Sequence, residues 1–222
     1  MKSPANVRRV TSLDVPELQP YRTLRRPMEH IKQGIFVAEG EKVVRRLLES
    51  NMKIISMLMT PEWNNRLFPN EHPTSNIEHR KPLTDNPKPF DVFIAEQELL
   101  ETIVGYNLHQ GIMAVAAVPE SMSIGETITR LTSPHLVVAL DGLVNAENVG
   151  LVVRNCAALG VDVLIAGETS SSPYLRRAVR NSMGAVFRLP VVHSTSLVES
   201  LHLLRRAHHT RIIAAHPQGE CT

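Results

Sequence analysis

Features that would place the protein in several common classes are missing from its sequence. The chain contains no apolar run long enough to cross a bilayer, and Met1 to Val10 carry basic side chains without the apolar core of a signal peptide. Its two cysteines, Cys156 and Cys221, give neither a disulfide framework nor a metal site. We therefore expect a cytoplasmic protein that holds no metal.

Two enzyme classes also lose support from what is absent. No G-x-G-x-x-G motif follows the apolar run Leu136 to Leu140, which argues against a dinucleotide-binding enzyme. Glu39, Asp141 and Glu168 do not form a convincing pair of carboxylates. Neither a glycosidase nor a two-metal hydrolase is therefore indicated.

The distribution of charge says more than its total. A net charge of +2 is weak support for a nucleic-acid partner, but Thr169 to Val198 contain no acidic residue. This stretch predicts a local basic surface, whose side chains contact either phosphate groups or only solvent. Its arginines are Arg176, Arg177, Arg180 and Arg188.

An alternation of strand and helix organises the second half of the chain. Leu136 to Leu140 and Val161 to Ala166 are apolar runs typical of buried strands. Between them, apolar residues repeat at helical spacing from Val149 to Gly160. Strand, helix and strand in this order predict the parallel crossover of an α/β sheet. Ligands of such sheets bind outside the carboxyl ends of the strands, so Asp141 to Gly150 lie at the expected functional edge.

The first half of the chain predicts a small α/β sandwich of its own. We expect a mobile tail over residues 1–20, a folded domain over 21–118 and a linker over 119–134 that includes a short helix. Trp63 to Pro89 are rich in Pro, Asn and His and predict a long loop with one short strand near Ile77. The other expected elements alternate between strand and helix: Ile35–Ala38, Lys42–Ser50, Ile54–Met59, Phe90–Ala95, Glu96–Val104 and Gly111–Val118.

Two ordered blocks resemble a known enzyme family. Asp141-Gly142-Leu143-Val144-Asn145-Ala146-Glu147-Asn148-Val149-Gly150, followed by Arg154, resembles the first signature of the SpoU (TrmH-like) RNA ribose 2'-O-methyltransferases of the SPOUT superfamily. Ser172 to Val191 resemble the next block of the same family. The first block departs from the family pattern at Ala146, where the family usually has a proline. The resemblance implies a parallel-sheet domain of the trefoil-knot type over residues 135–222, S-adenosylmethionine as cofactor, RNA as partner and a homodimer.

A weaker resemblance covers the first half. Phe36 to Gly40, together with His109-Gln110-Gly111, are similar to the substrate-binding domain found ahead of many SpoU catalytic domains, with a fold like that of ribosomal protein L30e. The resemblance favours ribosomal RNA over transfer RNA as substrate. It implies that His109 and the nearby arginines dock RNA; the alternative is a scaffold domain in which His109 is a turn residue. Those arginines are Arg22, Arg25 and Arg26.

The resemblance also assigns the reaction centre. It implies that Arg154 acts on the ribose hydroxyl or the adjacent phosphate. A guanidinium with a pKa above about 12 is a poor base, so we prefer a role in clamping the phosphate and stabilising the developing alkoxide. Asn148 is expected to contact the ribose and Asn145 to cap the helix. Without the family match, capping by both asparagines and an ordinary surface role for Arg154 would be favoured.

The methyl-donor pocket is expected to be incomplete. Leu197 to Arg206 predict a helix and Arg211 to Ala215 a strand, whose exit at Ala215, His216 and Pro217 matches the family strand that touches the donor. The Gly-Glu-Gly-type loop and the Ser-Leu-Asn segment, which complete the knot in the family, do not follow in the given sequence. The alternative function is therefore an RNA-binding protein, or a fragment, without catalysis.

Overall fold

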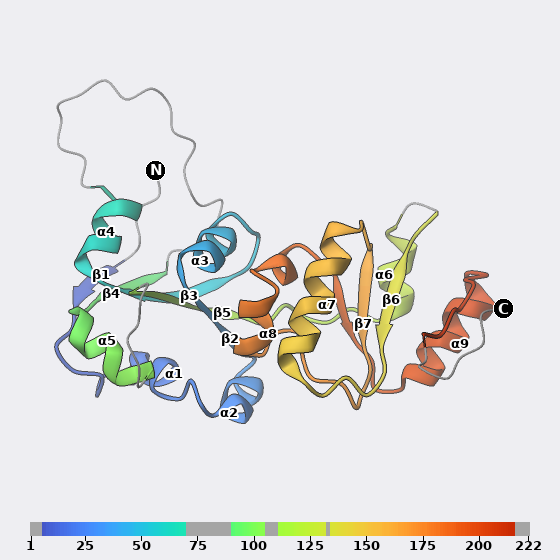
Figure 1. Ribbon diagram of the computed structural model, residues 1–222, viewed down its shortest axis with the longest axis horizontal. Helices are drawn as coiled ribbons and strands as arrows, with labels where there is room; N and C mark the ends of the chain where they lie inside the picture. The colour runs from blue at the N-terminus through green and yellow to red at the C-terminus, as the bar shows by residue number, and fades with distance from the viewer. Residues whose placement is uncertain (1–5, 70–89, 105–110, 132–133, 216–222) are drawn as a thin grey trace, which may run out of the picture.

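The protein was described in a computed structural model over residues 6–69, 90–104, 111–131 and 134–215. Within these ranges the chain forms a five-stranded sheet and a three-stranded sheet, one in each half of an elongated molecule (Figure 1). Helices cover both faces of each sheet. No helix in the described ranges is long and apolar enough to cross a membrane.

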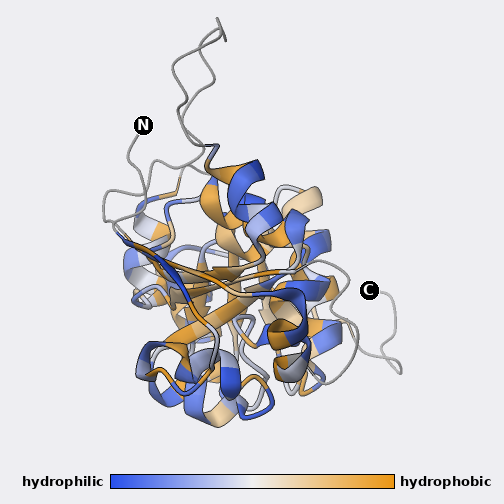
Figure 2. Cartoon of the chain, turned by 90° about the vertical axis from the view of Figure 1, so that its left-hand side faces the viewer, coloured by the Kyte–Doolittle hydropathy of each residue, from blue (hydrophilic) through white to orange (hydrophobic). Residues whose placement is uncertain are grey.

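The five-stranded sheet consists, in spatial order, of β1 (Asn6–Arg9), β4 (Asp91–Ile94), β3 (Ile54–Met59), β5 (Ile112–Ala117) and β2 (Ile35–Glu39). β1, β4 and β3 run parallel to one another, whereas β5 is antiparallel to both β3 and β2. Successive apolar side chains enter opposite cores, as Phe36 and Val37 do. The strands accordingly form an apolar layer through the middle of the molecule (Figure 2).

Two helices pack on each face of this sheet. α3 (Glu41–Leu48) and α4 (Pro61–Leu67) cover one face, and α1 (Gln19–Arg22) and α5 (Gln97–Val104) cover the other (Figure 1). The short α2 (Pro27–Lys32) follows α1 close to the second half of the molecule. Apart from α1, α2 and α4, these elements match the predicted alternation.

The predicted loop from Trp63 is wrong at its start, because Trp63 and Leu67 are buried side chains of α4. Pro61 occupies the first turn of this helix, where the missing N–H costs nothing and the fixed φ angle is favourable. The loop prediction rests instead on the density of Pro, Asn and His and on the lack of periodicity from Trp63 onward. The strand expected near Ile77 lies outside the described residues.

The predicted tail is wrong over residues 6–20. β1 pairs in parallel with β4 at the sheet edge, and the 3-10 helix Pro16–Leu18 buries Leu18 completely. All four side chains of β1 are exposed, so its place in the sheet depends on backbone hydrogen bonds and leaves no apolar periodicity in the sequence. A polar edge strand of this kind cannot be distinguished from a tail by composition.

The three-stranded sheet is parallel throughout and confirms the predicted α/β class. It contains β6 (Val137–Leu140), β7 (Val163–Ala166) and β8 (Val191–His193), with β7 in the centre. α7 (Ala146–Ala158) and α8 (Arg176–Asn181) pack on one face, toward Leu164. α6 (Ile124–Thr129) and α9 (Leu197–Ala207) pack on the other, toward Val163 and Ile165.

Part of the expected linker belongs to this second core. α6 begins with a capping box, in which the Ser123 side chain accepts from the Glu126 N–H and the Glu126 carboxylate accepts from the Ser123 N–H. Its Ile124 and Ile128 are buried with Leu204 of α9. The short helix predicted here therefore packs on the sheet that follows it.

Two expected strands of the second half differ from the prediction. Residues 211–215 form no strand, and Ile213 is 77% exposed. β-branched residues favour a strand only when a neighbouring strand pairs with them, and none of the described strands does so here. β6 forms as expected but is only partly buried, because among the described strands it has β7 as its single neighbour.

One apolar core joins the two halves. The Phe36 ring of β2 lies 5.6 Å from both the Tyr174 ring and the Phe187 ring of the second half. Arg46 of α3 donates to the Met183 carbonyl oxygen at the edge of this contact. The two sheets are thus held in a defined relative position by buried aromatic side chains.

Candidate functional site

Two serines hold the loop that follows β6. The Ser170 hydroxyl donates to the Leu140 carbonyl oxygen at 3.0 Å and accepts from the Leu143 N–H at 3.1 Å. The next hydroxyl, of Ser171, donates to the Val144 carbonyl oxygen. The loops after β6 and β7 are therefore tied together at the carboxyl edge of the parallel sheet, where ligands of such sheets bind.

Asn145 caps α7, as predicted. Its side-chain oxygen accepts from the backbone N–H groups of Glu147 at 2.9 Å and Asn148 at 3.1 Å. The Asn148 side chain is exposed and makes no hydrogen bond to any described residue. The structure thus confirms Asn145 as the cap, and the contact of Asn148 with the ribose stays a prediction.

Arg154 lies on the solvent face of α7. It is exposed and forms no ion pair or hydrogen bond within the part of the chain that the structure describes. Asn148 and Arg154 are both on exposed positions of this helix, with the half-exposed Leu151 between them in sequence. A fully charged guanidinium without a protein partner can bind a phosphate or an oxyanion without first breaking an internal contact.

The basic stretch on α8 meets acidic side chains that are remote in sequence. Arg176 Nη1 lies 2.6 Å from Glu39 Oε2, at the end of β2, and Arg180 lies 3.9 Å from the same carboxylate. Glu39 is only 9% exposed and Arg176 only 21%. Arg177 lies 3.8 Å from Glu147 in an exposed pair. Arg176 therefore has a structural partner that neither sequence interpretation predicted.

We predict that Glu39→Gln destabilises the protein by about 2 kcal/mol, because it leaves the half-buried Arg176 without its counter-charge. The control is Glu62→Gln, which removes an exposed ion pair to Arg66 within α4 and should change stability by less than about 0.5 kcal/mol. Urea unfolding of both variants measures the difference. Equal small effects would show that the Arg176–Glu39 pair contributes nothing to the contact between the halves.

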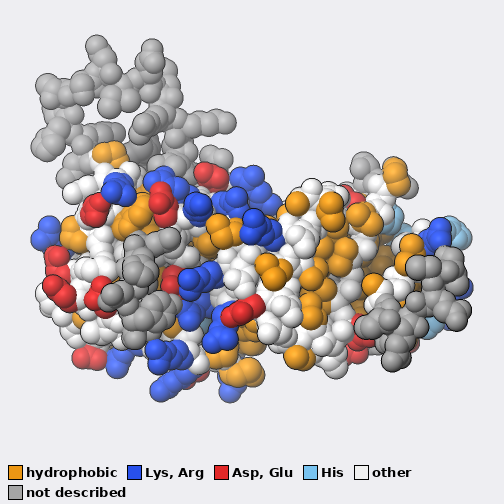
Figure 3. Space-filling view, in the orientation of Figure 1, with side chains coloured by type: hydrophobic (Ala, Val, Ile, Leu, Met, Phe, Trp, Pro, Cys, Tyr) orange, Lys and Arg blue, Asp and Glu red, His pale blue; other side chains and the backbone are white. Residues whose placement is uncertain are grey.

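The N-terminal arginines differ in their surroundings. Arg22 pairs with Asp14 at 3.1 Å, and Arg26 pairs with Glu29 at 3.0 Å. Arg25 is exposed and lines a cavity together with Arg176 and Arg177. The structure thus brings one predicted RNA-binding arginine of the first half beside two of the second, and Lys and Arg side chains gather where the halves meet (Figure 3). His109 lies outside the described residues.

Two cavities open at this junction. The basic cavity, of about 610 Å³, is lined by Arg25, Arg176 and Arg177 and reaches Ala146 at the start of α7. The apolar cavity, of about 270 Å³, is lined by residues of α2 and by Ser172, residues 174–176 and His193. Both share Leu24, Pro27, Leu175 and Arg176 in their walls, so they adjoin. Sequence reasoning missed the polar groups of the apolar cavity, since they come from separate segments: His30, Ser172, Tyr174 and His193.

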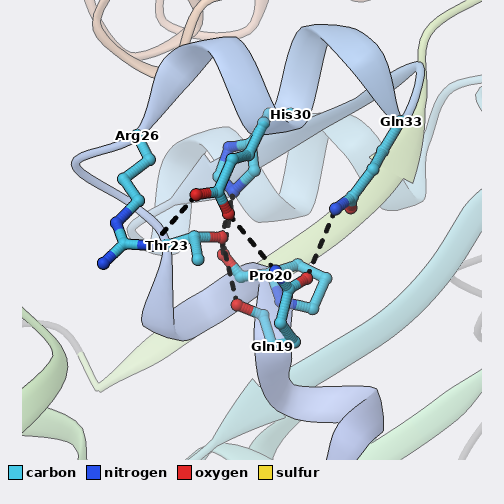
Figure 4. Close-up of polar contacts among 7 residues, drawn as sticks. Gln19, Pro20, Thr23, Arg26, His30 and Gln33 are labelled. Atoms are coloured by element: carbon cyan, nitrogen blue, oxygen red, sulfur yellow. Dashed lines mark hydrogen bonds and ion pairs between the residues drawn. The ribbon is translucent and has the colours of Figure 1, made fainter.

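A polar cluster joins α1 to α2 beside the apolar cavity (Figure 4). His30 Nε2 lies 3.0 Å from both the Pro20 carbonyl oxygen and the Thr23 hydroxyl. Because a carbonyl oxygen only accepts, Nε2 carries the hydrogen and Nδ1 is the position that would take a further proton. Burial lowers the pKa of His30; the bond to Pro20 and the charge of Glu29 oppose this shift, and the charge of Arg176 adds to it.

This lowered pKa predicts a loss of stability in mild acid. Below the unfolded-state pKa of about 6.5, the unfolded chain binds a proton at His30 that the folded chain resists. The contribution to stability is therefore present above that pH and lost as the pH falls toward the lower folded-state pKa. Urea midpoints measured from about pH 8 to about pH 5 should fall more steeply in the wild type than in His30→Gln. As a control, His202→Gln at an exposed position of α9 should show the same pH dependence of the urea midpoint as the wild type. The prediction would be contradicted if the midpoint of His30→Gln depended on pH as steeply as that of the wild type.

The expected methyl-donor residues do not form a pocket in the described part of the chain. Ala215 is exposed and lines neither cavity, and His216 and Pro217 lie outside the described residues. The Glu168 carboxylate, in the loop after the carboxyl end of β7, accepts from the Leu197 N–H at 2.8 Å. Hydrogen bonds from its own N–H and from Leu197 lower its pKa. The described part of the predicted donor site, Ala215, therefore lies apart from both cavities.

Comparison with known proteins identifies the second half. Residues 135–222 match the model of the SpoU rRNA Methylase family. This match includes both loops of the carboxyl edge and all of α7 and α8. Residues 135–222 belong to the SpoU rRNA methylase family. The resemblance seen in the sequence blocks is thereby confirmed for this SpoU domain.

Curated relatives extend the match beyond the SpoU domain. A Mycobacterium tuberculosis protein named as an uncharacterized tRNA/rRNA methyltransferase is 28% identical over 218 residues, which cover 96% of this chain and 69% of that protein. The 23S rRNA (guanosine-2'-O-)-methyltransferase RlmB of Ralstonia nicotianae is 28% identical over 113 residues, or 50% of this chain and 45% of that protein. These names indicate an RNA methyltransferase.

Solved structures share the fold over both halves. The AdoMet-bound rRNA methyltransferase from Sinorhizobium meliloti aligns with a TM-score of 0.70 and 21% identity, over 90% of this chain and 69% of that one. The SpoU methyltransferase AviRb from Streptomyces viridochromogenes, in complex with AdoMet, aligns with a TM-score of 0.66 and 20% identity, over 90% and 70% of the two chains. At these identities the likeness shows the fold.

No group of His, Cys, Asp or Glu suited to a metal occurs among the described residues.

Proposed function

We propose that this protein transfers a methyl group from S-adenosylmethionine to a ribose 2'-hydroxyl of structured RNA, with ribosomal RNA as the favoured substrate and transfer RNA as the second. The SpoU domain and the names of the relatives support the reaction class. The AdoMet-bound structural neighbours support the choice of donor. The observation that carries the proposal is Arg154, which is exposed and without a described partner on the helix that begins at the signature loop.

The residues of this chain would prepare the acceptor. S-adenosylmethionine supplies an electrophilic methyl group when it is bound. Arg154 binds the phosphate beside the target ribose and stabilises negative charge as the hydroxyl loses its proton to solvent water. Asn148 contacts the ribose, while the Asn145 cap and the two serine tethers hold the loop in place. Positioning of this kind converts a weakly acidic hydroxyl into a usable nucleophile.

The test is a methylation assay with S-adenosylmethionine and ribosomal or transfer RNA, followed by mass spectrometry of the nucleosides. We expect a ribose-methylated nucleoside. Methylation of a base would contradict the 2'-O proposal and retain the RNA methyltransferase class. Titration of S-adenosylmethionine and of its demethylated product into the same chain tests the donor separately. RNA binding without donor binding or methylation would favour the alternative of a noncatalytic RNA-binding protein.

The first half is proposed to be the RNA-docking domain, with an L30e-like fold. Arg22, Arg25 and Arg26 lie on or beside α1 and α2, close to the SpoU domain. Their charges, and that of His109 in its protonated form, would contact phosphates and orient the RNA without reading its sequence. Weaker RNA binding by arginine-to-glutamine variants, with unchanged donor binding, is the expected result.

The functional unit is proposed to be a cytoplasmic homodimer. Val144, Leu151 and Leu159 expose large apolar side chains around α7, and Leu159 is 76% exposed. Hydrophobic side chains gather over this face of the SpoU domain (Figure 3). Contiguous exposed apolar surface is typical of interfaces, and a second copy would also cover the flank of Arg154. Light scattering should give twice the monomer mass, and Leu151→Glu should lower it.

A further inference from the structure

The apolar cavity has the chemistry of a binding site. Its walls are mostly apolar and come from both halves of the molecule, since α2 and Val118 face Tyr174 and His193 of the SpoU domain. Its volume of about 270 Å³ lies just below the range of sites for drug-sized ligands, which begins at about 300 Å³. A single flat ring system suits a cavity of this size and composition.

Tyr174 places a hydroxyl group in the wall of the apolar cavity. Its side chain is buried, with 7% of the residue exposed, and its hydroxyl makes no hydrogen bond to the described residues. Burial raises the pKa of this hydroxyl, so it remains protonated and able to donate. The hydroxyl atom is not one of the fully enclosed, unpartnered polar atoms of the described residues, so it opens to the cavity and can donate to an occupant there. A polar ring edge in the cavity would supply the partner.

The adjoining basic cavity limits what the occupant can be. Arg25, Arg176 and Arg177 line the basic cavity. It reaches from the wall that it shares with the apolar cavity to Ala146 at the start of α7. An occupant that fits both cavities is anionic at one end and carries a flat ring at the other. A nucleotide has this composition, and unpaired RNA is recognised by splayed bases packed on aromatic and imidazole rings. The Tyr174 and His193 rings, with centroids 6.2 Å apart, provide such surfaces.

We propose that the apolar cavity holds an unstacked nucleobase of the RNA substrate, with the phosphate of the same nucleotide on Arg25 and Arg177. The proposal rests on the proposed function and specifies its substrate as RNA with an unpaired nucleotide near the target ribose. Arg176, held by Glu39, shapes the wall between base and phosphate, whereas Arg177 would exchange its exposed 3.8 Å pair with Glu147 for the phosphate. The cavity thereby selects loops over duplexes, because a paired base must give up its pairing and stacking to enter it.

The experiment compares two probes, a short single-stranded RNA of mixed sequence and the duplex of the same strand with its complement. Ile31→Trp places a large ring at the half-exposed rim of the cavity, and Tyr174→Phe removes only the hydroxyl. We expect Ile31→Trp to weaken single-strand binding by about tenfold and Tyr174→Phe by about fivefold, with duplex binding unchanged. Ile55→Trp, at a comparably exposed position of β3, is the matched control and should behave as the wild type.

Arg177→Gln should weaken both probes alike and lower the salt dependence by about one phosphate contact. Cross-linking of a 4-thiouridine-containing single strand should map to Tyr174 or His193. Cross-links elsewhere, together with wild-type binding by Ile31→Trp, would overturn the proposal even if the protein methylates ribose. Displacement of the single strand from the cavity by S-adenosylmethionine would overturn it in favour of a donor site. Selective single-strand binding without methylation would retain the cavity assignment and reject the proposed reaction.

Discussion

Replacing Arg154 with alanine is expected to lower the methylation rate by about 10²- to 10³-fold, while the free energy of unfolding changes by less than about 0.5 kcal/mol. The rate falls because a preorganised cation is removed from the developing alkoxide and its neighbouring phosphate. The stability is preserved because Arg154 is exposed and has no partner among the described residues. Single-turnover methylation and urea unfolding of the same preparation measure the two quantities.

Two further arginine substitutions test whether the position and shape of the Arg154 side chain are required. Arg154→Lys keeps the charge but loses the planar fork that binds two oxygens at once, so it should recover only part of the rate. Arg205→Ala removes an exposed arginine from the last turn of α9, outside the signature loop and α7, and should leave the rate unchanged. If Arg154→Ala and Arg205→Ala lowered the methylation rate equally, the effect would come from the loss of one positive charge and not from the position of Arg154. An active Arg154→Ala variant would reject the assigned role.

Replacing Gly150 with alanine is expected to destabilise the protein by about 2–3 kcal/mol. An added Cβ would lie 2.5 Å from the Ala178 carbonyl oxygen and 2.8 Å from the Asn181 Cβ, so α7 and α8 would have to separate. The gain of about 1 kcal/mol in helix propensity does not offset this clash, because the atoms met are mostly backbone. Separation of the helices would also displace Arg154, and methylation should fall together with stability.

Gly125→Ala is the matched control for Gly150→Ala. Gly125 lies in α6, where an added Cβ would meet only the Leu203 side chain at an ordinary contact distance of 3.5 Å. This variant should be neutral or more stable by up to about 1 kcal/mol. Urea midpoints of the two variants give the comparison. A stable Gly150→Ala protein would show that the helix contact can relax and that glycine is not required there.

Local sequence patterns predicted most of the secondary structure and part of the site. The apolar runs gave β3, β5 and β7, because a strand buried on both faces requires continuous apolar side chains. Asn145 was predicted as a cap from its residue type and its place before the helix, and the structure confirms it. The position of Arg154 on α7 followed from the apolar residues that repeat at helical spacing from Val149 to Gly160.

Patterns failed where one local signal has two physical outcomes. A segment rich in Pro, Asn and His forms either a loop or part of a helix, and only the burial of Trp63 and Leu67 decides for α4. The polar residues Asn6–Arg9 form either a tail or an edge strand, and pairing with β4 decides for the strand. Ile212 and Ile213 favour a strand by type, but residues 211–215 have no pairing partner among the described strands.

The sequence by itself determined the α/β class, the signature loop and the presence of a basic stretch on α8, because each depends on residues close together in the chain. Only the tertiary structure decided how those arginines are used. Arg176 pairs with Glu39, 137 residues away, and lines the basic cavity together with Arg25 and Arg177. The apolar cavity likewise arises where α2 meets Tyr174 and His193. Contacts between distant segments depend on how the two halves pack, and no local pattern encodes that arrangement.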